Sequence, residues 1–165
     1  MREYSKDGKE YKAYVQSLKN SALTAFYTPE PVVTAMQESL QLPGIRPGRF
    51  LDPSAGTGMF ISGLKDVSEV HCFEKDKLTG KILSSLYPES RVAIDGFQSI
   101  QPYYNNYFDM VSSNIPFGNT RVYDRDFDRS EDVVRKSSLA AVHNYFFLKG
   151  MDTLHEGGIL AYITT

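Results

Sequence analysis

The sequence lacks several features that would place it in a common class of protein. It has one cysteine, Cys72, so no disulfide can form within its 165 residues and we expect a reducing, cytoplasmic location. It has no hydrophobic run near the ~20 residues of a membrane-spanning helix. Its N-terminus, MREYSKDGKEYK, does not resemble a signal peptide. We therefore expect no membrane partner.

Neither the net charge nor the spacing of the histidines indicates a nucleic-acid-binding or metal-binding protein. The 18 Lys and Arg nearly balance the 20 Asp and Glu, which argues against a strongly basic nucleic-acid-binding module. The histidines His71, His143 and His155 lack ligand-like spacing to Cys or carboxylates, so no metal site is expected. Opposite charges also balance over residues 118–136, where we expect a solvated loop.

What the sequence does contain is a sizeable apolar fraction, 41%, arranged as alternating strands and helices. Strands are expected at residues 49–52, 68–74, 91–95, 107–114 and 159–165. Helices are expected at residues 5–20, from Pro29 to the LPGIRPG segment at 42–48, near 58–65, at 76–88 and at 137–155. Gly157 and Gly158 are expected to end the last helix.

Strands separated by helices predict an α/β fold of three layers, with a mostly parallel sheet covered by helices on both faces. In such sheets ligands bind beyond the carboxyl ends of the strands, where the strand order reverses. Four polar side chains stand at the expected strand ends: Asp52, Glu74, Asp95 and Asn114. These side chains are therefore the first candidates for a binding or catalytic site.

The loop after the first strand, DPSAGTG (52–58), combines Asp52 with two glycines, Gly56 and Gly58. Glycines at a strand end let the backbone approach a ligand closely. No Gly-Lys-Ser/Thr follows, so this is not a phosphate-binding loop. Ile61 stands where a dinucleotide fingerprint needs its third glycine. An ordinary tight turn is the alternative interpretation, and the acidic residue before the glycines weighs against it.

Two further strand ends carry acidic residues that suit a bound nucleoside. The carboxylate of Glu74 is placed to accept both ribose hydroxyls, although it would also favour the dipole of the following helix. Asp95 would then face the nucleoside base, with Phe97 available to lie against the ring. An Asp-Gly turn is the simpler explanation of this second pair.

The segment Asn114-Ile115-Pro116-Phe117 at the end of the fourth strand carries the sharpest chemical prediction. An exocyclic amine on a base is a poor nucleophile because its lone pair is shared with the ring. Hydrogen bonds from that amine to the Asn114 side-chain oxygen and the Ile115 carbonyl would localise the lone pair and stabilise the developing charge. Phe117 would stack on a flipped-out base, worth ~1–3 kcal/mol. A plain turn and a core phenylalanine are the alternatives.

In their order, these segments resemble the catalytic domain of amino-directed, adenine-specific DNA methyltransferases, which use S-adenosyl-L-methionine. NIPF (114–117) resembles the Asn-Pro-Pro-Tyr/Phe catalytic loop of that family. The other matching segments are FYTP (26–29) beside the methionine part of the cofactor, DPSAGTG (52–58) as the glycine loop, FEKD (73–76) at the ribose, IDGF (94–97) at the adenine, and GGILAYITT (157–165) as a later core strand.

The resemblance implies a role for each matching residue. Catalysis is assigned to Asn114, Ile115, Pro116 and Phe117. Cofactor binding is assigned to Phe26, Tyr27, Thr28, Asp52, Ser54, Gly56, Gly58, Glu74, Asp95 and Phe97. Two positions depart from the family pattern, since Ile115 replaces the first proline of the catalytic loop and Gly96 separates Asp95 from Phe97.

The resemblance also implies an organisation. We expect a Rossmann-like α/β/α methyltransferase fold truncated after its fifth core strand. Residues 1–28 would form a helix and a cofactor-flanking loop, and residues 29–165 the incomplete catalytic core. The segments YPESRVAIDGFQSI, SSNIPFGNTRV and HNYFFLKGMDTLHEGGILAYITT are similar to methylase domains of large methylase–helicase fusions from phages and other mobile elements, where methylation accompanies restriction or anti-restriction. The implied partners are DNA, bound mainly through elements outside this chain, and other domains of the same protein.

The residues leave other functions open. The same chemistry applies to adenine in RNA or to a glutamine side chain in a protein, and the Asn-x-Pro-aromatic loop does not distinguish them. A non-catalytic binding module of a larger machine is a second alternative, disfavoured because Asn114 and the glycine loop are intact. A nicotinamide-dependent oxidoreductase is disfavoured by Ile61.

Overall fold

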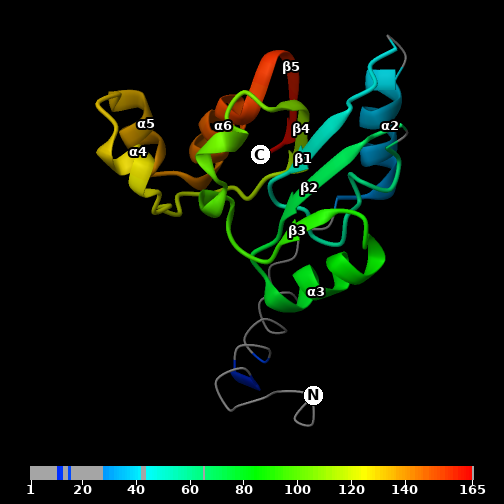
Figure 1. Ribbon diagram of the computed structural model, residues 1–165. Helices are drawn as coiled ribbons and strands as arrows, with labels where there is room; N and C mark the ends of the chain where they lie inside the picture. Colours follow the sequence, from blue (N-terminus) through cyan, green and yellow to red (C-terminus); the bar gives the residue numbers. More distant parts are fainter. Residues whose placement is uncertain (1–10, 13–14, 16–27, 42–43, 65, 165) are drawn as a thin grey trace.

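A parallel sheet forms the centre of the chain (Figure 1). The computed structural model describes residues 11–12, 15, 28–41, 44–64 and 66–164. Within these residues five strands form one sheet in the order β3-β2-β1-β4-β5, and every neighbouring pair is parallel. The strands are β1 (Arg49–Asp52), β2 (Glu69–Phe73), β3 (Arg91–Ala93), β4 (Phe108–Asn114) and β5 (Leu154–Ile163).

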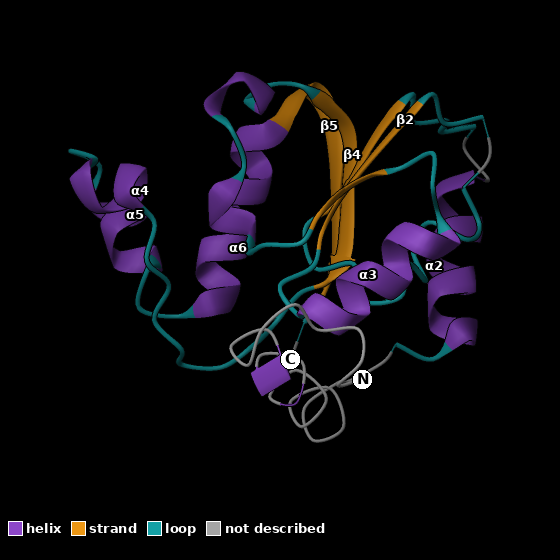
Figure 2. Cartoon of the chain, turned by 60° about the horizontal axis from the view of Figure 1, so that its bottom comes forward, coloured by secondary structure: helices purple, strands orange, loops and turns teal. Residues whose placement is uncertain are grey.

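Helices cover both faces of this sheet, as Figure 2 shows. The α-helices of the described residues beyond 28 are α2 (Glu30–Gln41), α3 (Lys77–Leu86), α4 (Arg125–Arg129), α5 (Val133–Ser138) and α6 (Val142–Thr153). Helices α2 and α3 bury Val33 and Leu83 in a core cluster on one face, and α6 buries Tyr145 in a cluster on the other. The predicted three-layer α/β fold is therefore confirmed.

The central strands are buried because they are covered from both sides. In β1, Phe50 and Leu51 are 1% and 0% exposed, and Phe50 packs in the cluster on the α2 side while Leu51 packs on the α6 side. A strand buried on both faces is a continuous apolar run rather than an alternating one. This is why short runs such as RFLD could be assigned to strands from the sequence alone.

The helix expected near 58–65 is absent from the described residues, and that prediction is wrong. Residues 56–63 form successive turns, with the Gly58 N–H donating to the Ala55 oxygen and the Ile61 N–H to the Gly58 oxygen. Gly58 has a φ of +90°, a torsion outside the right-handed helical region. The chain therefore turns repeatedly here instead of continuing as a helix.

The solvated loop expected over 118–136 contains two short helices, so that prediction also needs correction. Asp124 caps α4 by accepting the Asp126 and Phe127 N–H groups, and Asp132 caps α5 by accepting the Val134 N–H. An aspartate at the N-cap satisfies backbone donors that the first helical turn leaves unpaired. Each cap therefore starts a helix inside a sequence of balanced charge.

The last helix and strand also differ from expectation. Helix α6 begins at Val142 and ends at Thr153, and β5 follows directly at Leu154. Gly157 and Gly158 lie inside β5, where the register shifts between the pairs Phe108–Leu154 and Met110–Ile159. Gly157 adopts a φ of +84°, a torsion that glycine reaches without steric cost and that a β-bulge can require. The glycines therefore form the bulge and do not end the helix.

The predicted helix at 5–20 lies mostly outside the described residues; residues 11–12 and 15 are helical. The division into residues 1–28 and 29–165 stays a prediction. No helix of the described residues is long and apolar enough to cross a membrane. Within the same ranges, no group of three His, Cys, Asp or Glu side chains could hold a metal ion.

Candidate functional site

The carboxyl ends of β1 and β4 meet where the sheet reverses its order, with β2 and β3 on one side and β5 on the other. Parallel pairing brings the loops after these two strands to the same edge. Ser113 joins them, because its hydroxyl donates to Asp52 Oδ1 at 2.6 Å. A topological switch point of this kind is where open α/β sheets bind ligands.

Asp52 is fully buried, with 0% exposure. Its Oδ1 accepts the Ser113 hydroxyl and the Ser54 N–H, whereas its Oδ2 is buried with no hydrogen-bond partner. No ion pair joins Asp52 to a described residue. Burial raises the pKa of Asp52 to about 7, although the Ser113 hydrogen bond opposes that shift. A buried, unpaired carboxylate oxygen at a strand end is a candidate for ligand binding.

Glu74 closes the glycine loop from the next strand. Its Oε2 accepts the Gly56 N–H at 2.8 Å and its Oε1 accepts the Asp76 N–H at 2.7 Å. Burial raises the pKa of Glu74, and the two backbone hydrogen bonds oppose the rise. The helix after it is capped by Asp76, which accepts the Thr79 N–H at 2.8 Å. Glu74 is therefore not needed as the helix cap and instead fixes the shape of the loop.

The two glycines of the loop have different surroundings. A side chain at Gly56, with φ +54°, would meet nothing within 4 Å. A Cβ at Gly58, with φ +90°, would stand 2.3 Å from the Tyr87 ring and 2.9 Å from Leu83. Gly56 therefore faces open space, whereas Gly58 allows the loop to pack against α3.

The predicted base contacts at Asp95 and Phe97 are not brought together at the surface. Asp95 is exposed and its Oδ1 accepts the Gly96 N–H at 2.7 Å. Phe97 is 1% exposed, and its ring packs among the rings of Phe73, Tyr145 and Phe146. The Phe97 ring therefore lies in the hydrophobic core, whereas the sequence predicted that it would contact a bound base at the surface.

The segment 114–117 leaves the sheet beside β5. Asn114 is the last residue of β4 and pairs with Ile163, and Phe117 is 37% exposed. Ile115 is 1% exposed, and its N–H donates to the Ile163 oxygen at 3.1 Å. A proline at position 115 has no N–H to donate. The departure from the family pattern therefore adds a hydrogen bond and a buried side chain that anchor the loop.

Among the remaining predicted residues, Phe26 and Tyr27 lie outside the described residues, and Thr28 is half-buried just before α2. Ser54 contributes its N–H to Asp52 and its carbonyl oxygen lies 3.4 Å from the Ser113 hydroxyl. Ser113 itself is missing from the sequence-based prediction. Its signal is weak: a serine in a buried strand, directly before the proposed catalytic asparagine.

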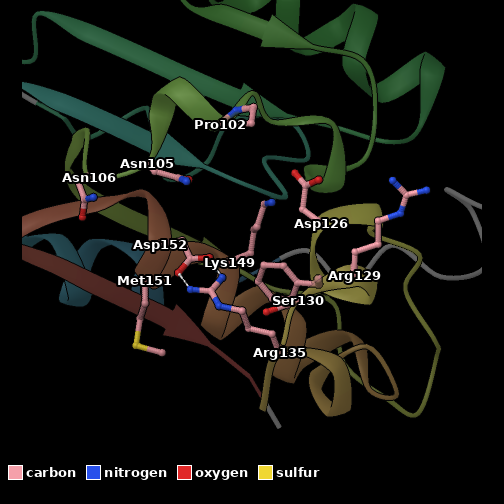
Figure 3. A pocket seen from close by; sticks show the side chains of 11 residues that line it. Pro102, Asn105, Asn106, Asp126, Arg129, Ser130, Arg135, Lys149, Met151 and Asp152 are labelled. Carbon is pink, nitrogen blue, oxygen red and sulfur yellow. Dashed lines mark hydrogen bonds and ion pairs between the residues drawn. The ribbon is translucent and has the colours of Figure 1, made fainter. Parts of the chain in front are cut away.

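A hollow of about 690 Å³ lies away from this edge (Figure 3). Its walls come from α4, α5, the end of α6 and the turn that precedes β4. Two of its cationic side chains have acidic partners, since Arg135 binds Asp152 and Lys149 binds Asp124 at 3.0 Å. It therefore lacks the unpartnered buried carboxylate oxygen that distinguishes the carboxyl edge.

No family model matches the chain. The chain is 31% identical over 148 residues to the Defense against restriction protein B of Escherichia phage P1. The match covers 86% of this chain but 6% of that protein, so the chain spans a small part of its relative's length.

Solved structures share the fold. A modification subunit of a putative type I restriction enzyme from Vibrio vulnificus YJ016 superposes with a TM-score of 0.62 at 19% identity, over 93% of this chain and 37% of that one. A putative RNA methyltransferase from Pyrococcus horikoshii superposes with a TM-score of 0.60 at 20% identity, over 94% of this chain and 74% of that one. A putative class I S-adenosylmethionine-dependent methyltransferase from Listeria monocytogenes superposes with a TM-score of 0.59 at 16% identity, over 96% of this chain and 54% of that one. The chain therefore has the Rossmann-like fold of class I methyltransferases, as predicted.

Proposed function

We propose that the chain is an S-adenosylmethionine-dependent methyltransferase domain that methylates the exocyclic amine of a flipped adenine in DNA. The observation that carries the proposal is the buried, unpartnered Oδ2 of Asp52 at the switch point of a methyltransferase fold. Asn114 ends the neighbouring strand and is tied to this carboxylate through Ser113. The proposed cation site and the residue Asn114 thus lie at the same edge of the sheet.

The residues at this edge fit the adenosyl cofactor. The Asp52 Oδ2 is an acceptor suited to the ammonium group of the cofactor's methionine part. Gly56 leaves space for a close approach to the backbone. Each Glu74 oxygen accepts one backbone N–H, and a carboxylate oxygen has a further lone pair for a ribose hydroxyl. We assign Phe26, Tyr27 and Thr28 to the methionine side and Asp95 to the adenine side of the same ligand, by resemblance.

The catalytic segment would act on the substrate amine without a strong base. S-adenosylmethionine held at this edge would supply an electrophilic methyl group to the substrate amine, whose proton would pass to solvent. The Asn114 side-chain oxygen and the Ile115 carbonyl accept the amine hydrogens and stabilise the positive charge on nitrogen. Ile115 is held by its hydrogen bond to Ile163, which fixes the direction of the segment. Pro116 stiffens it, and Phe117, at 37% exposure, offers a stacking face.

The relative from phage P1 supports a role connected with restriction, since its name states defence against restriction. Because the chain covers 6% of that protein, DNA recognition and further domains are proposed to lie elsewhere in such a protein. The restriction-enzyme modification subunit that shares the fold agrees with the same context.

The proposal is tested by incubating the full-length protein that carries this chain with S-adenosylmethionine bearing a labelled methyl group and with DNA, RNA or protein. We expect label on the exocyclic amine of adenine in DNA. Replacing Asn114 by Ala should lower the rate by about 10²–10³-fold while cofactor binding stays unchanged. Asn119→Ala, at an exposed position nearby, is the matched control and should keep full activity. Label on RNA or protein alone would contradict DNA as the substrate, and equal loss of binding and transfer in Asn114→Ala would make the segment structural.

A further inference from the structure

Ser113 is the one described side chain whose hydroxyl bonds the Asp52 carboxylate. It is 0% exposed and directly precedes Asn114 on β4, whereas Asp52 ends β1. Its hydroxyl donates to Asp52 Oδ1 at 2.6 Å, the same oxygen that accepts the Ser54 N–H at 3.1 Å. Two donors therefore hold one carboxylate oxygen, and the other oxygen has none.

We propose that Ser113 is a positioning residue for the cofactor's amino group: by holding Oδ1 of Asp52, its hydroxyl reserves Oδ2 for a cationic ligand. This inference rests on the proposed function and adds to it the residue that prepares the amino-acid end of the cofactor site. A hydroxyl serves here because it can donate to the carboxylate without bringing a competing charge, as a lysine or arginine would.

The groups that face Asp52 support this assignment. Glu74 follows β2, Cys72 lies on β2, and Tyr162 lies on β5; each interacts electrostatically with Asp52, and none of them is a cation. Burial raises the pKa of Asp52 and the Ser113 hydrogen bond is the largest effect that lowers it. Without the hydroxyl, a smaller fraction of Asp52 is ionised near neutral pH, and the carboxyl group loses the donor that sets its rotation.

The test compares two ligands that differ in the amino-acid end. S-adenosylhomocysteine carries the ammonium group, and 5′-methylthioadenosine carries the same adenosine and thioether without it. Each is titrated by calorimetry and equilibrium dialysis into the parent chain, Ser113→Ala and Ser112→Ala. Ser112→Ala is the matched control, because Ser112 is the neighbouring serine and is also buried, at 4% exposure.

We expect Ser113→Ala to weaken S-adenosylhomocysteine binding about tenfold near neutral pH, the size of a lost hydrogen bond to a charged group. Binding of 5′-methylthioadenosine should change by less than about twofold, on the additivity of separate contacts. Between pH 5.5 and 7.5, affinity for S-adenosylhomocysteine should rise with pH as Asp52 ionises, and Ser113→Ala should move the midpoint upward. Ser112→Ala should resemble the parent.

The outcomes separate the two claims. If neither ligand binds the parent chain, the proposed function fails. If the parent binds both but Ser113→Ala weakens both equally, or leaves the midpoint unchanged, Ser113 is structural and the inference is overturned. Circular dichroism checks the fold of each variant. Should Ser113→Ala unfold, Ser113→Cys takes its place, because cysteine is close to serine in size but is a weaker hydrogen-bond donor. Ser113→Cys must then weaken S-adenosylhomocysteine binding more than 5′-methylthioadenosine binding, by a smaller factor.

Discussion

The carboxylates at the two edges of the sheet have different partners. At the amino edge, Asp109 pairs with Arg49 at 2.8 Å and with His155 at 2.9 Å, and Glu69 accepts from Tyr107 at 2.6 Å. At the carboxyl edge, Asp52 accepts from a hydroxyl and a backbone N–H and has no cation within the described residues. Asp109 and Glu69 thus have charged or hydroxyl partners at the amino edge, whereas Asp52 at the carboxyl edge has no cationic partner among the described residues.

The pKa values follow this division. Burial favours neutral Asp109, yet the hydrogen bonds from Arg49 outweigh it and hold the pKa of Asp109 below its usual range. The Tyr107 and His71 hydrogen bonds lower the pKa of Glu69. Burial instead raises the pKa of Asp52 and of Glu74. Ionised groups held without a counter-ion cost stability, and folds keep such groups mainly where a ligand completes them.

The strongest way to break the carboxyl edge is to disturb the loop that frames it. Gly58→Ala places a Cβ against the Tyr87 ring and forces a φ of +90° on alanine. We expect a loss of about 3 kcal/mol of unfolding free energy, from strain and displaced packing. Gly56→Ala has open space at its Cβ and is the control, with about 1 kcal/mol lost to its positive φ. Urea denaturation measures both, and equal losses would contradict the different roles of the two glycines.

Ligand binding should distinguish the two edges directly. Asp52→Asn removes the negative charge at the carboxyl edge and should weaken S-adenosylhomocysteine binding by about tenfold or more. Asp109→Asn removes a carboxylate at the amino edge and should leave binding unchanged. Calorimetric titration of both variants tests this expectation, and an equal effect on binding would show that the unpartnered oxygen of Asp52 is not special.

The same two variants should respond oppositely to pH. The unfolded chain ionises Asp52 near 3.8 while the folded chain keeps the proton to about 7, so this residue lowers stability as pH rises across that window. Relative to the parent, the melting temperature of Asp52→Asn should therefore improve from pH 5 to pH 8. Asp109 has a lowered pKa, so its stabilisation is present above its unfolded pKa and is lost as pH falls through the folded value.

Asp109→Asn should accordingly melt below the parent at pH 5 and at pH 8 alike, and the difference should shrink toward pH 3. Thermal melts at these pH values measure both variants. A parallel pH response of the two variants would mean that the edges do not differ in the way the hydrogen bonds indicate.

Much of the fold could be predicted from the sequence because its signals are local. Apolar runs ending in Asp52 and Asn114 predict the buried strands β1 and β4, and both bounds at the carboxyl edge agree with the structure. The turns at 56–63 were not predictable from local patterns, since Gly58 combines a φ of +90° with close packing against Tyr87, far along the chain. The balanced charges of residues 118–136 predicted a loop, and the helix caps at Asp124 and Asp132 became apparent only in the structure.

The site was predicted in its positions more than in its contacts. Because β1 and β4 are parallel neighbours, Asp52 and Asn114 at their carboxyl ends lie at one edge of the sheet, as the sequence predicted. Glu74 lies against the glycine loop, where it accepts the Gly56 N–H. The burial of Phe97 depends on α6, whose Tyr145 and Phe146 rings surround it, and no local pattern shows this. The bond between Ser113 and Asp52 joins residues 61 positions apart, so it emerges only from the pairing of β1 with β4.

The most direct test of the account is equilibrium dialysis of labelled S-adenosylmethionine against the chain at pH 7.5, with Asp52→Asn alongside. The account predicts saturable binding of one molecule per chain, displaced by S-adenosylhomocysteine and weakened in Asp52→Asn. No retention of the cofactor by the folded parent chain, or equal retention by the variant, would contradict the claim that the carboxyl edge of this sheet is built to bind it.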